Sequence, residues 1–367
     1  MQFRPRQQVT TAGVAVVALT LALGACSSSS SSSTPSGGSS SSSGGGSASA
    51  SVSGTLNGSG STFQLAFQQA AISAFKSVQP SLTVNYGGGG SGKGRTDLAA
   101  GTVNFAGSDS TIPDKEASNF TGKTVLYFPV VIGPITLSYN LSGVSGLKLS
   151  PSTIAGIFSG KIKTWNDAAI KADNSGASLP STAITLAVRS DSSGTTANFS
   201  NFLVESAGSA WTLGTSSTIN WPSTARAGSG NAGVAQIVKS TPGAIGYVDY
   251  ADAKASNLTF ASVKNQAGNF VAPSTDSATA AAQNATVKPD DTFSAIWAPG
   301  AQSYPITYQS FVLVYQSQSS ADTAAGLKAY LGYLLGDGQK LLPQLNYAPL
   351  PSNIDQQATA QLSKIGS

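Results

Sequence analysis

Histidine is absent from this chain of 367 residues, and there is a single cysteine, Cys26. The lack of histidine excludes the Ser-His-Asp and Cys-His catalytic arrangements and the usual histidine-rich metal sites. One cysteine has no partner for a disulfide and cannot by itself form a thiolate metal site. Carboxylates remain as metal ligands, but no Asp and Glu residues follow the spacing of a calcium loop. We therefore expect no bound metal, no cofactor and no enzymatic activity.

Charge is also scarce, because only 10% of the residues are charged and the formal net charge is +4. Two of the basic residues, Arg4 and Arg6, lie in a segment that we expect to be removed, which lowers the charge further. Binding to nucleic acid requires a basic patch or stripe on the protein. The sequence therefore predicts a surface of neutral hydrogen-bonding groups and no nucleic-acid partner.

The N-terminus has the pattern of an export signal. Two arginines precede an apolar run at 12–23, which is too short to be a stable membrane span. The run ends in the sequence LGAC, which resembles a bacterial lipobox and places small residues before Cys26. This pattern predicts a signal peptide at 1–25 and lipidation of Cys26, with the protein anchored to the outer face of the bacterial cell membrane. The alternative is a secreted protein in which this cysteine is unmodified.

Serine and glycine dominate the segment 26–54, which begins with Cys26. Such a composition cannot form a hydrophobic core, so we expect a flexible tether. The remaining residues, 55–367, are enough for two domains. In this part short β-type runs alternate with helical stretches, which predicts an α/β fold.

Hydrophobic periodicity predicts individual elements in the folded part. Apolar residues such as Phe63, Phe67 and Phe75 recur with helical spacing, which predicts a helix over 61–78. We expect further helices at 93–100, 152–158, 196–205 and 323–335, and strands at 82–86, 103–105, 124–131, 135–139, 184–188, 244–248 and 311–315.

Three turns rich in glycine, serine and threonine, at 58–62, 90–92 and 192–195, each separate a strand from a helix. The first N–H groups of a helix have no partner within the helix, and the helix dipole adds positive potential there. Three such turns, one of them close to Arg189, favour an anion-binding site. For a single turn the alternative is simple N-capping, because Ser and Thr are good caps.

Two glycine motifs are similar to nucleotide-binding sequences, but each lacks a feature that such a site needs. Residues 87–93 fit G-x-x-x-x-G-K, but Gly94 stands where a nucleotide-binding P-loop needs a metal-binding hydroxyl. Residues 228–233 fit G-x-G-x-x-G, and Asp249 follows about 20 residues later. However, the preceding residues 220–227 are polar and the helix expected at 234–240 is short. We expect a glycine-rich turn that caps a helix, and no nucleotide site.

Taken together, several motifs resemble one known family. They are GSGSTF (58–63), VNYGGGGSGKG (84–94), NFAGSD (104–109), GIFSGKIKTWND (156–167), RSDSSGTT (189–196) and PGAIGYVDYA (242–251). In order and spacing they are similar to the phosphate-binding proteins of high-affinity phosphate ABC importers, the PstS family. The resemblance begins near residue 55 and continues to the C-terminus.

The resemblance implies a two-domain periplasmic-binding-protein-like fold of type II, with the ligand in the cleft between the domains. Domain 1 would comprise 55–130 and 306–367, and domain 2 would comprise 131–305, with hinges near 129–134 and 302–308. The implied function is to capture inorganic phosphate as a monomer and to deliver it to the membrane permease of the importer.

The resemblance also implies the residues of the site. Phosphate contacts would come from Thr62, the backbone N–H of Phe63, Ser91 and Asp109 in domain 1, and from Arg189, Ser193, Gly194 and Thr195 in domain 2, with Asp191 paired to the arginine. Many members of the family have proline at the position of Gln64. Proline would preset the start of the helix there, so the position of this helix is less constrained.

A carboxylate such as Asp109 beside an anion has a chemical explanation. Phosphate near neutral pH carries at least one O–H that a carboxylate can accept, whereas sulfate carries none. Asp109 would therefore favour phosphate and repel sulfate. Alternative interpretations of the chain are an exported phosphatase on the same scaffold, or a receptor for arsenate, sulfate or molybdate.

Overall fold

A computed structural model describes residues 52–367. The predicted signal peptide, Cys26 and nearly all of the tether lie outside the described residues. The strands are β1 (Gly54–Gly60), β2 (Leu82–Gly88), β3 (Phe105–Ser108), β4 (Val125–Tyr139), β5 (Lys148–Leu149), β6 (Thr185–Arg189), β7 (Arg226–Gly228), β8 (Ala244–Asp249), β9 (Thr259–Phe260), β10 (Ser262–Lys264), β11 (Phe270–Val271) and β12 (Thr307–Tyr315).

The α-helices are α1 (Leu65–Val78), α2 (Ser91–Ala99), α3 (Pro151–Phe158), α4 (Ala168–Asp173), α5 (Gly194–Ala207), α6 (Gly230–Ser240), α7 (Tyr250–Ala255), α8 (Thr275–Ala282), α9 (Ala321–Leu335) and α10 (Ser352–Gln361). Short 3-10 helices lie at Asp114–Phe120, Gly208–Ala210, Asp337–Leu341, Pro343–Leu345 and Leu362–Lys364. None of the helices described between residues 52 and 367 has the length and apolar character that a membrane crossing requires.

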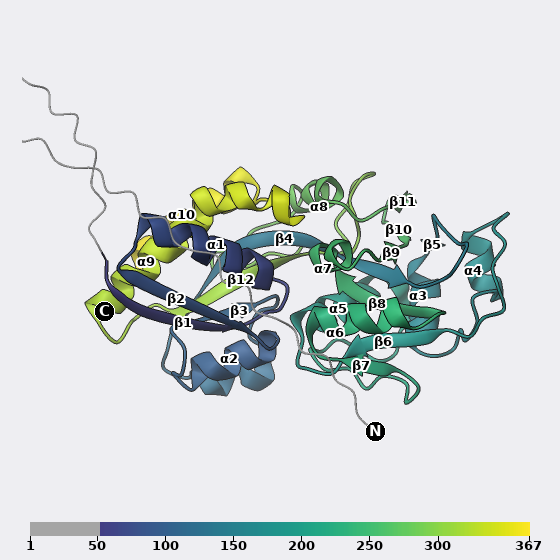
Figure 1. Ribbon diagram of the computed structural model, residues 1–367, viewed down its shortest axis with the longest axis horizontal. Coiled ribbons are helices and arrows are strands. Elements are labelled where there is room, and N and C mark those ends of the chain that lie inside the picture. The colour runs from purple at the N-terminus through teal and green to yellow at the C-terminus, as the bar shows by residue number, and fades with distance from the viewer. Residues whose placement is uncertain (1–51) are drawn as a thin grey trace, which may run out of the picture. The chain divides into compact units, whose positions relative to one another are not determined.

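Most strands belong to one large sheet with the order β2-β1-β3-β12-β4-β8-β6-β7, and β9 also pairs with β4. We call β1, β2 and β3 the first strand group, and β6, β7 and β8 the second strand group. Pairing is parallel within each group, whereas β12 and β4 are antiparallel to their neighbours. In Figure 1, β4 and β12 run between the two groups. Strands β5, β10 and β11 form a separate small sheet.

Strand β4 links the two groups, and here the sequence-based prediction was wrong. We expected two strands, at 124–131 and 135–139, but the structure has one strand of 15 residues. Gly133 and Pro134 suggest a break in the sequence, because both residues are frequent in turns. In the structure Pro134 pairs with Thr307, the first residue of β12, and from Ile135 onward the partner is β8. The N–H that proline lacks is therefore missing only at the end of a ladder, where it costs little.

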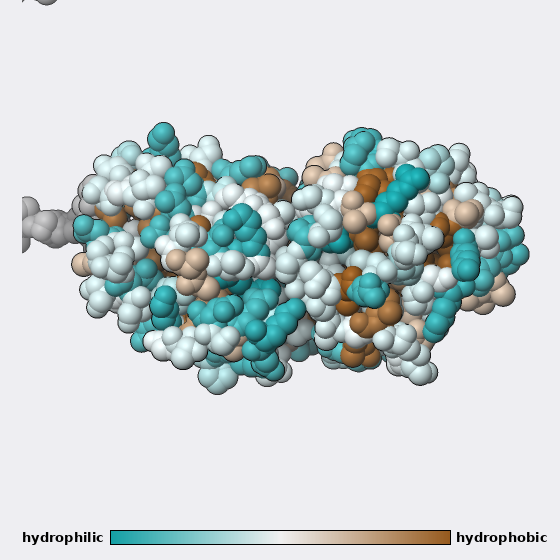
Figure 2. Space-filling view, turned by 90° about the horizontal axis from the view of Figure 1, so that it is seen from below, coloured by the Kyte–Doolittle hydropathy of each residue, from teal (hydrophilic) through white to brown (hydrophobic). Residues whose placement is uncertain are grey.

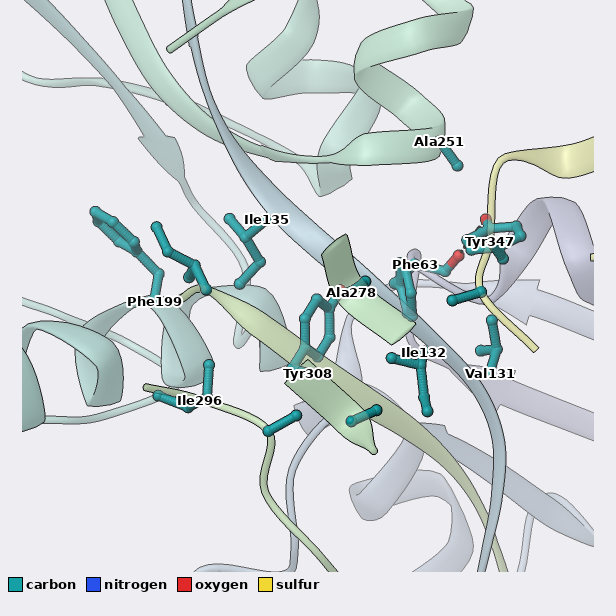
Figure 3. Packing of buried hydrophobic residues seen from close by; sticks show 14 of the residues in the cluster. Phe63, Val131, Ile132, Ile135, Phe199, Ala251, Ala278, Ile296, Tyr308 and Tyr347 are labelled. Atoms are coloured by element: carbon teal, nitrogen blue, oxygen red, sulfur yellow. Dashed lines mark hydrogen bonds between the residues drawn. The ribbon is translucent and has the colours of Figure 1, made fainter. Parts of the chain in front are cut away.

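Helix α1, which follows β1, has the buried face that the sequence predicted. Phe67, Ala71 and Phe75 of α1 are buried, in agreement with the helical spacing in the sequence. The preceding residue Phe63 is fully buried and packs on the ring of Tyr308, with 4.7 Å between the ring centroids. Figure 3 shows Phe63 and Tyr308 among other buried core residues, of which Val131, Ile132 and Ile135 belong to β4. Burial of one such side chain contributes about 1.5–3 kcal/mol to the free energy of unfolding.

The glycine turn at 228–233 caps a helix, as predicted, but its surroundings differ from the prediction. Residues 226–228 form β7, a short strand parallel to β6 that we did not predict. Helix α6 begins at Gly230 rather than at residue 234. Gly230 adopts a positive φ of 64°, which glycine allows at little cost. A methyl group on Gly228 would come within 2.5 Å of the Gly233 backbone, so glycine permits close packing of strand and helix.

The surface is mostly polar, as the composition predicted. Among the described residues, the only exposed large hydrophobic side chains are Val78, Val204 and Leu213. Figure 2 shows one face of the molecule, on which hydrophobic residues form separate patches among pale and hydrophilic ones. Scattered apolar residues of this kind are normal on a soluble domain and need no partner to explain them.

Candidate anion-binding site

The three predicted turns lead into α1, α2 and α5. Helix α2 begins at Ser91 and α5 at Gly194, each two residues earlier than expected, so the residues of these turns lie in the first helical turn. Helix α1 begins later than expected, at Leu65, and its N-cap residue Gln64 makes no side-chain capping bond; Ser61 Oγ accepts the N–H groups of Phe63 and Gln64 in the turn before the helix. Each of these helix starts therefore lies a few residues after the end of a strand, β1, β2 or β6.

Asp109 directly follows β3 and is only 2% exposed. Its Oδ1 accepts hydrogen bonds from the hydroxyl of Ser61, at 2.5 Å, and from that of Ser310. Its Oδ2 accepts only from Ser91, at 3.2 Å. Burial raises the pKa of Asp109, while the three hydroxyls and the charge of Arg189 oppose the rise. The carboxylate thus has one oxygen with two donors and one oxygen with a single, longer bond.

Arg189, the last residue of β6, has a guanidinium group that is almost fully buried. Its Nε and Nη2 donate to the two oxygens of Asp191, at 2.8 and 2.5 Å. Burial disfavours the charge of Asp191, but the arginine outweighs this and lowers its pKa. The remaining nitrogen, Nη1, makes only long bonds, of 3.3 Å to Thr195 Oγ1 and 3.4 Å to Asn231 Oδ1. Its hydrogens are the ones best able to turn to an anion.

Several contacts join residues of α2 and β3 to residues of α5. A methyl group on Gly194 would lie 2.6 Å from the Cβ of Asp109, so only glycine allows this approach. The N–H of Gly92 donates to the carbonyl of Ser192 at 3.0 Å. The side-chain amide of Asn198 donates to the carbonyl of Asp109 at 2.6 Å. The structure therefore brings the predicted residues Asp109 and Gly194 together although they lie 85 positions apart in the sequence.

The other predicted residues have protein partners. Thr62 Oγ1 accepts from the amide of Asn231 at 3.3 Å, and the N–H of Phe63 donates to Ser61 Oγ at 3.1 Å. The hydroxyl of Ser193 accepts the N–H of Thr196 at 3.1 Å and caps α5. For Ser193 the N-capping interpretation is therefore correct, although a cap satisfies only some of the N–H groups at a helix start.

Comparison with known proteins identifies the family of the chain. The model of the PBP superfamily domain matches residues 45–337. The phosphate-binding protein PstS of Pasteurella multocida is 36% identical over 313 residues, which cover 84% of this chain and 89% of that protein. The phosphate-binding protein PstS 3 of Mycobacterium leprae is 34% identical over 321 residues, covering 85% and 87%. The chain belongs to the PstS family of phosphate-binding proteins.

Solved structures of similar fold include other phosphate-binding proteins. The PfluDING periplasmic phosphate-binding protein with bound phosphate has a TM-score of 0.69 at 22% identity, covering 84% of this chain and 94% of that one. A putative phosphate transporter substrate-binding protein of Clostridium perfringens has a TM-score of 0.61 at 16% identity, covering 81% and 100%. The predicted α/β fold of the two-domain periplasmic-binding-protein kind is confirmed.

Gln64, the residue at which this PstS-family chain departs from the proline of many members, is fully buried next to the site. Its amide nitrogen donates to Ser310 Oγ at 2.6 Å and to the carbonyl of Phe311 at 2.7 Å. Because Ser310 accepts from Gln64, its own hydrogen is left for Asp109. A side chain that the sequence marked only as a deviation thus helps to orient a donor to the central carboxylate.

Sequence analysis of this PstS-family chain missed other polar residues of the site. They are Ser61, Asn198, Asn231, Asp249, Tyr308 and Ser310. Asp249 ends β8 in the same way that Asp109 follows β3, so the strand-end position could have indicated it. Ser310 lies within β12 and carries no comparable signal. Across residues 52–367, no three His, Cys, Asp or Glu side chains are grouped so that they could hold a metal ion.

Proposed function

We propose that the chain is an extracytoplasmic solute-binding protein that captures inorganic phosphate between two domains and delivers it to the permease of a phosphate ABC transporter. The observation that carries this proposal is the buried Asp109 carboxylate beside the starts of α2 and α5, with Arg189 close enough to influence its pKa. A fully ionised anion would be repelled by Asp109. An anion that still carries a proton can instead donate it to the carboxylate.

Phosphate would enter by exchanging hydrogen bonds. The single bond on Asp109 Oδ2 comes from Ser91, so that hydroxyl can turn to a phosphate oxygen while Oδ2 accepts the phosphate O–H. The two donors on Oδ1, Ser61 and Ser310, stay in place and keep the carboxylate oriented. A buried anion needs a partner for nearly every oxygen, and the helix N–H groups supply the rest.

Arg189 would supply the permanent positive charge. Two of its nitrogens are held by Asp191, which orients the guanidinium plane, and Nη1 is free to replace its long bonds with bonds to phosphate. A bond between two charged groups is worth about 1.5–3 kcal/mol, more than the neutral contacts it would replace. Asp191 also accepts the N–H of Gly230 at 2.9 Å, which ties the pair to the start of α6.

The two domains are proposed to be 55–130 with 306–367, and 131–305. This division is supported by β4, in which the pairing partner changes from β12 to β8 at Pro134 and Ile135. Bending there, and near the start of β12 at 302–308, would open and close the cleft around the ligand. We further propose export by the signal peptide at 1–25, lipidation of Cys26, and a monomer held at the outer face of the cell membrane.

Selectivity tests the proposal. In titration calorimetry the wild type should bind phosphate and reject sulfate, with arsenate as a third ligand. Asp109→Asn keeps an acceptor for Ser61 but presents a donor to the anion, so the ratio of phosphate to sulfate affinity should fall by about 10-fold or more.

Asp337→Asn is the matched control, because Asp337 is an exposed residue paired only with Lys340. An unchanged ratio in Asp109→Asn would contradict the role of the carboxylate, and the absence of phosphate binding by the wild type would contradict the function itself. We propose no catalytic activity, and turnover of an aryl phosphate by the wild type would favour the exported phosphatase instead.

A further inference from the structure

Asp249 is a second buried carboxylate close to the anion site. It is the last residue of β8, is fully buried, and pairs with Ile135 at the point where β4 changes partners. Its Oδ1 accepts from the hydroxyl of Tyr308 at 2.6 Å. Its Oδ2 accepts from Thr195 Oγ1 at 3.1 Å and from the amide of Asn231. Three different elements, β12, α5 and α6, therefore meet on this one side chain.

All three donors to Asp249 are neutral. Among the ion pairs within residues 52–367, none involves Asp249. Taking a carboxylate out of water without a paired cation is costly, and protonation relieves that cost. The environment of Asp249 thus differs from that of Asp191, whose two oxygens are both bonded to the Arg189 guanidinium.

The bond between Thr195 and Asp249 has a consequence for ligand binding. A threonine hydroxyl has one hydrogen to donate. In this structure that hydrogen is directed to Asp249, and Thr195 Oγ1 accepts from Arg189 Nη1. While Asp249 is ionised, Thr195 has no hydrogen for a phosphate oxygen. If Asp249 is protonated on Oδ2, the acid donates to Thr195 Oγ1, and the hydroxyl hydrogen can turn to the ligand.

We propose that Asp249 is a positioning residue: where it is ionised in the free protein, it takes up a proton from solvent when phosphate binds and thereby makes Thr195 a donor to the anion. The inference rests on the proposed phosphate-binding function. The proton moves from water to Asp249 Oδ2, no covalent bond to phosphate forms, and the charge of the site becomes more positive by one unit. That added charge offsets part of the charge of the incoming anion.

Burial, more than the surrounding charges, moves the titration of Asp249 upward. Burial, followed by the nearby carboxylates Asp252 and Asp109, raises the pKa of Asp249 to about 8, while Tyr308 and Arg189 oppose the rise. Tyr347 also faces this group of acids, and burial keeps its pKa well above the ordinary value, so its hydroxyl stays neutral. A bound anion would favour the protonated acid further.

Proton uptake can be measured by titrating phosphate into the wild type in buffers of different ionisation enthalpy. Phosphate itself changes protonation on binding, so the relevant quantity is the difference between the wild type and Asp249→Asn at each pH. With a pKa of about 8 in the free protein, this difference should be about half a proton near pH 8, close to zero near pH 6, and about one proton near pH 9.5.

Asp249→Asn should still bind phosphate, because an asparagine amide can donate to Thr195 as the protonated acid does. Asp252→Asn is the matched control, since burial raises the pKa of this acid to about 7 and yet it makes no bond to Thr195. Uptake that disappears in Asp252→Asn and persists in Asp249→Asn would overturn the proposal. Equal uptake by the wild type and Asp249→Asn at pH 8 and above would do so as well.

A second variant covers the case in which Asp249→Asn does not fold, as judged by circular dichroism. Tyr308→Phe removes a donor that lowers the pKa of Asp249, so the pH of half-maximal uptake should move upward. An unmoved midpoint would refute the assignment of the proton to Asp249. Failure of the wild type to bind phosphate would instead refute the proposed function, so the two failures are distinguishable.

Discussion

Replacing Gln64 by methionine tests whether the interior behind Asp109 is built from a chain of hydrogen bonds. Methionine keeps the length of the side chain and removes only its amide. In this series of hydrogen bonds the Tyr330 hydroxyl donates to Gln68 at 2.6 Å. The Gln68 amide donates to Gln64 at 2.9 Å, and the Gln64 amide donates to Ser310 at 2.6 Å. Ser310 then donates to Asp109.

The expected loss of stability follows from the bonds removed. Gln64 takes part in three buried side-chain bonds, to Ser310, to the carbonyl of Phe311 and from Gln68. Each is worth about 1 kcal/mol net, and leaving the Gln68 amide without its acceptor adds about 1–3 kcal/mol. We therefore expect Gln64→Met to lower the free energy of unfolding by about 4–6 kcal/mol. Urea denaturation monitored by circular dichroism measures this change.

The same substitution should also weaken phosphate binding. Without the Gln64 amide, the Ser310 hydroxyl can turn away from Asp109, and the carboxylate loses one of three donors. Phosphate affinity should then fall by up to about 10-fold, the equivalent of one hydrogen bond. The matched control is Gln302→Met, because Gln302 is exposed. A Gln64→Met protein as stable as the wild type, with the same affinity, would refute the hydrogen-bond chain.

Two further predictions concern the site itself. Arg189→Ala removes the charge that faces the anion and leaves Asp191 without its partner, so calorimetry should show at least a 10-fold loss of phosphate affinity, and an unchanged affinity would contradict the assignment. Gly194→Ala places a methyl group against Asp109 and should therefore prevent closure of the two domains. In small-angle scattering, phosphate should reduce the radius of gyration of the wild type but not that of this variant. Gly87→Ala, where a methyl group meets nothing within 4 Å, should behave as the wild type does, and equal compaction of all three proteins would count against closure at Gly194.

Local sequence patterns predicted most of the elements but not their exact ends. The apolar spacing of Phe67, Ala71 and Phe75 is a property of one helix, so it can be recognised without the rest of the chain. The ends depend on local backbone contacts as well, and α1 begins only at Leu65, after a turn in which Ser61 Oγ accepts the N–H groups of Phe63 and Gln64. The continuity of β4 through Pro134 was missed because it depends on which strands lie on either side.

The sequence by itself determined the chemistry that this protein can use. Without histidine, and with glycine and hydroxyl residues before the predicted helices, it allows an anion site built from helix starts, one arginine and carboxylates. The motifs also indicated the family, and the resemblance to it implied that Asp109 and Arg189 belong to the site.

Only the tertiary structure decided which carboxylate each buried hydroxyl of the site bonds to. Ser310 lies 201 positions from Asp109, and Tyr308 lies 59 positions from Asp249. These contacts arise because β12 pairs with both β3 and β4 and passes between the two strand groups. Hydrogen bonds are short and directional, so their partners follow from strand pairing and packing rather than from local spacing.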